Sequence, residues 1–127
     1  MKSVDTNVLV RFILGDGPFQ ATRAEEILRA GVLVPVTVFL ELGWVLSSRY
    51  GFDRLKLSKT LNALLDVPGI AIADERAVRH ALAAHAKGAD FADALHLATA
   101  RGTEAFVTFD KGVKAKFGMG IPVELAI

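Results

Sequence analysis

The 127-residue chain is long enough for one domain with a single buried core, and no second domain is expected within residues 1–127. Although 52% of its residues are apolar, no apolar stretch approaches the ~20 residues of a membrane span. Charged residues near the N-terminus argue against a signal peptide, so we expect a cytoplasmic protein. The absence of cysteine excludes disulfides and thiolate metal sites, and 15 basic against 14 acidic residues provide no global charge that would attract nucleic acid.

Short apolar strands alternate with longer helical patterns along the chain, which is typical of a parallel sheet covered by helices. Glycine and proline mark the turns between these segments. In the first half, the pattern predicts a strand at residues 1–4, a helix capped by Thr6, a helix at residues 18–30, a strand at residues 32–36 and a helix that Thr37 caps and that carries Glu41.

The second half of the chain continues this alternation. A helical pattern runs through residues 55–65, and a Pro-Gly break then leads into a strand at residues 70–73. We next expect a helix from an Asp74 cap to Lys87, a helix at residues 91–101, a strand at residues 105–109 and an edge strand at residues 122–125. The total is about five strands and about six helices.

Four acidic residues lie in apolar sequence, whereas most of the others occupy turns, caps or polar helix faces. The four are Asp5, Glu41, Asp93 and Asp110. The helix around Asp93 is apolar on nearly every face, so we expect its carboxylate to be buried or to face a cleft. An ionised carboxylate in such surroundings needs a cation, several hydrogen bonds or a proton.

The predicted topology places these four acids near one edge of the sheet. Asp5 and Asp110 follow strands, and Glu41 and Asp93 lie near the starts of helices, where open α/β sheets bind ligands. Converging carboxylates repel by about 4 kcal/mol per pair at ~4 Å and an effective dielectric constant near 20, so a divalent cation is the natural counter-charge. An oxygen-only site suits Mg²⁺ or Mn²⁺ and implies phosphodiester hydrolysis by metal-activated water.

The same segments resemble the motifs of the PIN-domain family. The resemblance covers nearly the whole chain, through residues 4–11 (VDTNVLVR), the Glu41 segment, residues 90–98 (DFADALHLA) and residues 107–110 (VTFD). It implies a three-layer α/β/α fold with a mainly parallel sheet of about five strands. The chain length is similar to that of the VapC toxins, which are the ribonuclease half of bacterial toxin–antitoxin pairs.

The resemblance also implies a site and partners. It implies an endoribonuclease that acts on structured or messenger RNA, forms a homodimer and is bound by a VapB-like antitoxin. It assigns the Mg²⁺ or Mn²⁺ ion to four carboxylates with supporting polar groups. The carboxylates are Asp5, Glu41, Asp93 and Asp110, and the supporting groups are those of Thr6, Asn7 and Thr108.

Several of these residues also have a purely structural interpretation. Asp5 and Asp110 are suited to capping the helices that follow their strands. Glu41 is able to form a buried ion pair with Arg11 or Arg49 instead of binding a metal.

The segment around Asp93 leaves two further alternatives open. Asp90 either supports the metal site or simply caps the helix that contains Asp93. His96 invites a zinc interpretation, but no second nitrogen ligand is present in the motif, and a histidine in the core or in an interface is favoured.

The lysines and aromatic residues near the acids also have both a functional and a structural interpretation. Lys111, Lys114 and Lys116 either contact RNA phosphates or form a solvated helix face. Phe39 and Trp44 share a helix that is otherwise aliphatic, so we expect them in the core or in a partner interface rather than in a base-stacking platform.

Two other functional classes remain as alternatives. A PIN-like domain without catalysis would act only as an interaction module. A phosphoreceiver signalling domain has a similar length and alternation, but its pattern has paired acids after the first strand, whereas Asp5 stands alone and Asp93 lies inside a helix.

Overall fold

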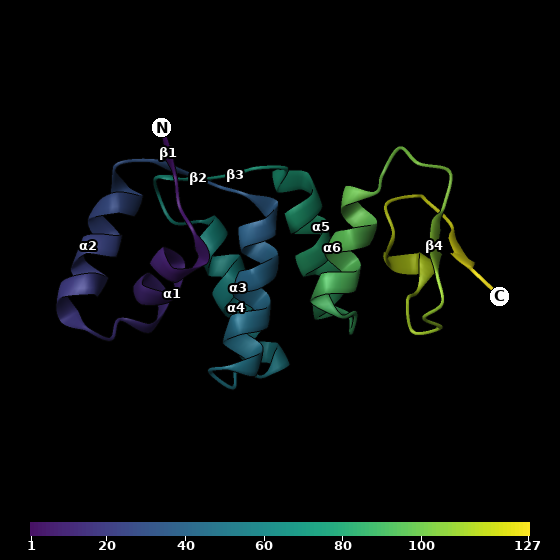
Figure 1. Cartoon of the computed structure of the whole chain (residues 1–127), viewed down its shortest axis with the longest axis horizontal. Helices are drawn as coiled ribbons and strands as arrows, with labels where there is room; N and C mark the ends of the chain where they lie inside the picture. Colours follow the sequence, from purple (N-terminus) through teal and green to yellow (C-terminus); the bar gives the residue numbers. More distant parts are fainter. The chain divides into compact units, whose positions relative to one another are not determined.

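Parallel strands alternate with helices along the chain in the computed structural model, which describes residues 1–127 (Figure 1). The structure has six α-helices, one 3-10 helix and five strands. This confirms the α/β class and the number of elements that the sequence predicts. The chain divides into two compact units, Met1–Glu75 and Arg76–Ile127.

The first unit contains a three-stranded parallel sheet in the order β1-β2-β3. The central strand β2 buries its two valines and exposes the leucine between them, as expected of a strand with period-two alternation. The strands are β1 (Lys2–Ser3), β2 (Val32–Val34) and β3 (Ile70–Ile72), and the helices are α1 (Thr6–Leu14), α2 (Pro18–Arg29), α3 (Val36–Ser48) and α4 (Arg54–Leu65).

Leucine side chains from all four helices form most of the core of this unit. In Figure 1 these helices extend away from the three short strands. Helix α1 packs against both α2 and α3, and α3 packs against α4. The fully buried side chains include Leu9, Leu28, Phe39, Leu42, Leu46, Leu61 and Leu64.

The second unit joins two helices to a small parallel sheet. Its elements are α5 (Glu75–Ala86), α6 (Phe91–Thr99), β4 (Phe106–Thr108), the 3-10 helix η1 (Ala115–Phe117) and β5 (Val123–Leu125). Helices α5 and α6 meet where the ring of His85 packs edge-on against Phe91, with the ring centroids 6.2 Å apart. Strand β4 pairs with β5, and Leu97 of α6 packs with Val113 and Ile121 of the C-terminal segment.

The strands differ from the prediction in their arrangement. They form one sheet of three strands and one of two, rather than a single sheet of about five. Each strand has only two or three residues, and β4 pairs with β5 within the second unit, whereas β1, β2 and β3 pair within the first. The apolar runs in the sequence extend beyond these paired residues, which is why the predicted strands are too long.

Two helix starts also differ from the prediction. Asp5, not Thr6, caps α1, because its Oδ1 accepts a hydrogen bond from the backbone N–H of Val8 at 3.3 Å. Helix α3 begins at Val36 rather than after Thr37, since Pro35 has a fixed φ and no N–H that would remain unsatisfied at a helix start.

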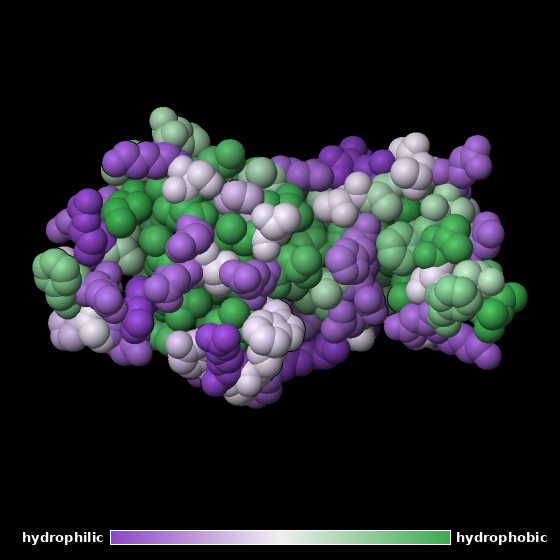
Figure 2. Space-filling model, viewed as in Figure 1, coloured by the Kyte–Doolittle hydropathy of each residue, from purple (hydrophilic) through white to green (hydrophobic).

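No helix combines the length and the apolar character that crossing a bilayer requires. Part of the apolar excess of the sequence lies on the surface, where Figure 2 shows apolar residues among hydrophilic ones. The exposed large apolar side chains include Phe19, Trp44, Leu55, Phe109 and Ile127.

Candidate metal and substrate site

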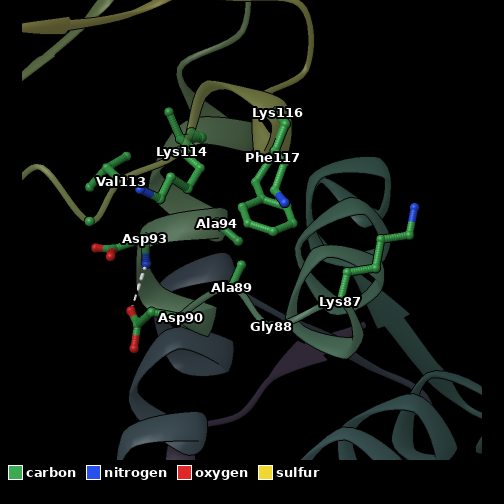
Figure 3. A pocket seen from close by; sticks show the side chains of 12 residues that line it. Lys87, Gly88, Ala89, Asp90, Asp93, Ala94, Val113, Lys114, Lys116 and Phe117 are labelled. Atoms are coloured by element: carbon green, nitrogen blue, oxygen red, sulfur yellow. Dashed lines mark hydrogen bonds between the residues drawn. The ribbon is translucent and has the colours of Figure 1, made fainter.

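Helix α6 presents two acids at its beginning. Asp90 is the N-cap, and its Oδ2 accepts a hydrogen bond from the backbone N–H of Asp93 at 3.0 Å. In Figure 3 the two carboxylates point to the same side of the helix. The capping interpretation of Asp90 is thus confirmed, and the cap places a second negative charge beside Asp93.

Asp93 is half-buried and faces a pocket, as its apolar sequence context predicts. Burial raises the pKa of Asp93 above its ordinary value, and the charges of Asp90 and Asp110 raise this pKa further. His96 is exposed on the same helix and lowers the pKa of Asp93, but its effect is smaller than the other three. Its side of α6 faces solvent, so His96 does not lie in the core, and its exposure is compatible with the interface interpretation.

Asp110 follows strand β4 and is fixed by the loop that it begins. Its backbone N–H donates to the Oγ1 of Thr108 at 3.0 Å, and its Oδ1 accepts from the N–H of Gly112 at 2.7 Å. Thr108 thus supports the conformation of Asp110, consistent with a supporting role. Because these bonds occupy only one carboxylate oxygen, the other oxygen of Asp110 remains available for a ligand.

Lysines share the pocket of about 450 Å³ that Asp90 and Asp93 line. Lys114 lies above Asp93 in Figure 3, whereas the ammonium group of Lys87 points away from the two acids. Lys116 lies over the ring of Phe117, 5.0 Å from its centroid. All three lysines are exposed. A pocket that combines carboxylates with ammonium groups is suited to a cation together with a phosphate.

Asp5 and Glu41 belong to the first unit. Strands β1 and β2 are parallel neighbours, so the helices that follow them, α1 and α3, begin at the same edge of the sheet. Asp5 caps α1, and the next two residues, Thr6 and Asn7, line a pocket of about 310 Å³ together with Glu41. Thr6 is buried, whereas Asp5, Asn7 and Glu41 are exposed.

Glu41 does not form the buried ion pair that the sequence left open. It is exposed and forms no ion pair with Arg11 or Arg49. Arg11 instead contacts the carboxylate of Asp16, at 3.5 Å. The oxygens of Glu41 are therefore free to bind a cation.

Within neither unit do three or more His, Asp or Glu side chains form a group that could hold a metal ion. The chemistry of the donors nevertheless fits a hard divalent cation. All are carboxylate oxygens, and the fold disfavours the negative charge of Asp93 in the absence of a counter-charge. A divalent cation would supply that counter-charge.

Sequence reasoning missed two features of these pockets. No function was predicted for Lys87, which lines the pocket of Asp90 and Asp93. Its position three residues before the Asp90 cap is the signal that could have indicated a role. Trp44 does not lie in the core, which is one of the two places expected for it, because it is 61% exposed and lines the same pocket as Glu41. Its position three residues after Glu41 places both on one helix face.

Comparison with known proteins gave one match. The sequence profile described as PIN domain matches residues 2–116 of the chain. No curated protein and no solved structure gave a match.

Proposed function

Because this chain belongs to the PIN domain family, a family of metal-dependent nucleases, we propose that it is a Mg²⁺- or Mn²⁺-dependent endoribonuclease. The matched residues extend across both units, which supports a single PIN domain over residues 1–127. The observation that carries the proposal is the pocket in which Asp90 and Asp93 lie with three lysines. It offers oxygen ligands for a cation and positive charges for an RNA backbone.

The proposed metal ligands are the carboxylates of Asp5, Glu41, Asp93 and Asp110. When bound, the ion would activate water and neutralise the negative charge that develops on the phosphate. Asp5 commits its Oδ1 to the cap of α1 and Asp110 commits its Oδ1 to a loop N–H, which fixes both groups in place. The Oγ1 of Thr108 accepts the backbone N–H of Asp110 and so orients Asp110. Thr6 and Asn7 would support the site from α1.

Lysines of the second unit have a separate part in this proposal. Lys114 and Lys116 lie near Asp93 in the loop and turn after Asp110. The chain has a net charge of only +1, so the affinity for RNA must come from local groups such as these. They would hold the phosphates that flank the bond to be cleaved.

We further propose the finer role of a VapC-type toxin that forms a homodimer and is inhibited by a VapB-like antitoxin. Large apolar side chains on the surface, such as Phe19 and Leu55, are compatible with partner interfaces of this kind. Sedimentation of the purified chain, alone and co-expressed with the product of an adjacent reading frame, tests the dimer and the partner. A chain that remains monomeric and gains no partner would contradict this finer role.

The central test is cleavage of total cellular RNA by the partner-free protein with Mg²⁺ or Mn²⁺, with the new ends mapped by sequencing. We expect discrete cuts that disappear with EDTA and in Asp93→Asn. The matched control is Glu104→Gln, which neutralises an exposed acid of the same unit and should cut like the unaltered chain. If metal binding is measured and no cuts appear, the chain acts as a non-catalytic interaction module instead.

A further inference from the structure

Helix α3 places its two large aromatic side chains in opposite environments. Phe39 is fully buried in the core, whereas Trp44 is 61% exposed. Tyr50, just beyond the end of the helix, is 45% exposed. Two exposed aromatic rings therefore flank the end of a helix that also carries Glu41. Neither ring contributes fully to the core, so both are available to a ligand.

Trp44 and Tyr50 line the same pocket of about 310 Å³, between α1 and the C-terminal half of α3. Polar side chains share it, since Asn7 enters from α1 while Glu41 and Arg49 come from α3 and its C-cap. This volume is at the lower end of the range of about 300–1,000 Å³ that is typical of small-molecule sites. It is suited to one planar ring system rather than to a double helix.

We propose that this pocket binds one unpaired nucleobase of the RNA substrate, stacked on Trp44. The inference rests on the proposed function, because Glu41 is a proposed metal ligand and a base in its pocket belongs to a nucleotide close to the cleaved phosphate. Splayed bases of single-stranded RNA stack on aromatic side chains, whereas bases inside a duplex are out of reach. The enzyme therefore selects single-stranded segments or loops.

The polar groups of the pocket complement this ligand. The side-chain amide of Asn7 offers both a donor and an acceptor to the edge of a base. Arg49 is exposed and forms no ion pair with Glu41, so its guanidinium group is available for a flanking phosphate or for stacking. Of the two, Asn7 confers a preference for particular bases, which stacking and phosphate contacts by themselves do not provide.

The same polar groups favour a nucleotide over a second copy of the chain. Charged residues are depleted at the centre of protein interfaces, because burying an unpaired charge is unfavourable. Here Glu41 and Arg49 lie beside Trp44 and do not pair with each other. A solvated ligand that carries its own phosphates leaves both charges accessible to water.

The first experiment uses the fact that Trp44 is the only tryptophan of the chain. Its emission is recorded during titration of the Asp93→Asn variant, in Mg²⁺, with a single-stranded oligoribonucleotide and with the same strand in a duplex. We expect saturable quenching by the single strand and at least tenfold weaker binding of the duplex. Quenching that is absent or equal for the two ligands would overturn the inference.

The second experiment measures cleavage of single-stranded RNA by three variants. In Trp44→Ala we expect KM to rise at least about fivefold, since stacking contributes about 1–3 kcal/mol per base and tenfold in affinity corresponds to 1.4 kcal/mol. Trp44→Phe keeps an aromatic face and should restore most of the affinity. Gln20→Ala, which truncates an exposed side chain of α2 outside the pocket, is the matched control and should match the unaltered chain.

These measurements separate failure of the inference from failure of the proposed function. Normal cleavage by Trp44→Ala refutes the base pocket and leaves the nuclease intact. Quenching by single strands without any metal-dependent cleavage supports the pocket and refutes the nuclease. If emission shifts with protein concentration in the absence of RNA, and Trp44→Ala converts a dimer to a monomer, then a second copy occupies this surface and the inference is wrong.

Discussion

Replacing Asp93 with Asn is expected to stabilise the metal-free protein, because the fold disfavours the charge of this side chain. Burial raises the pKa of Asp93 above its ordinary value of 3.8, and Asp90 and Asp110 raise it further. Below pH 3.8 the carboxyl is protonated in both the folded and the unfolded chain. As the pH rises through the raised pKa, the unfolded chain ionises more readily, so the folded state loses stability. Asn carries no charge and escapes this loss.

Desolvation of the half-buried carboxylate and repulsion from Asp90 and Asp110 favour Asn, whereas the N-terminus of α6 favours the charged Asp93. Like charges ~4 Å apart repel by about 1 kcal/mol in water and by about 4 kcal/mol near a protein surface. Asp90 and Asp110 are exposed, so their repulsion of Asp93 lies toward the lower figure. The charge of Asp93 also interacts favourably with the N-terminus of α6, by about 0.3–1 kcal/mol, which Asn loses. We therefore expect a net gain of about 1 kcal/mol at neutral pH.

Urea denaturation in EDTA between pH 4 and pH 8 measures this gain. The difference between Asp93→Asn and the unaltered chain should be small at pH 4 and reach its full size at neutral pH, whereas Glu104→Gln should show no such trend. Addition of Mg²⁺ should reverse the order, because the ion stabilises only the chain that binds it. A variant that is destabilised at neutral pH, or a gain that is independent of pH, would refute the reasoning and make Asp93 a structural residue.

Three further predictions concern stability and local order. In urea denaturation, Gly69→Ala should destabilise the chain by at least about 2 kcal/mol, because the φ of Gly69 is +96° and an added Cβ would overlap a carbonyl oxygen of α2. Gly31 has the same φ but open space around it, so Gly31→Ala should lose only about 1–2 kcal/mol. Asp5→Asn should keep the cap of α1 but weaken Mg²⁺ binding in calorimetry. Asp5→Ala should lose both the cap and the Mg²⁺ binding, and equal stability of the two variants would contradict the cap. His80→Phe removes the 2.8 Å hydrogen bond that Nε2–H donates to the carbonyl oxygen of Phe117, and it should speed tryptic cleavage of η1. Unchanged cleavage would show that the bond does not hold this segment.

Local sequence signals determined much of the fold. Apolar periodicity located every α-helix and strand to within a few residues, because the faces that a helix or strand buries repeat along the chain at 3.6 or 2 residues. Capping by Asp90 was one of two interpretations that the sequence left open, and a short-range rule suggested it because the partner is the N–H of Asp93, three residues away. The order of the four acids also pointed to the family that matches residues 2–116.

Tertiary structure decided what depends on neighbours distant in the sequence. Phe39 and Trp44 have similar apolar contexts on one helix, yet one is buried and the other exposed, because burial depends on which face meets other helices. The raised pKa of Asp93 depends partly on Asp110, which a separate strand and loop bring near. The strands form two sheets because pairing depends on which edges meet. Sequence patterns record which residues favour burial or charge, but only packing decides which of them meet.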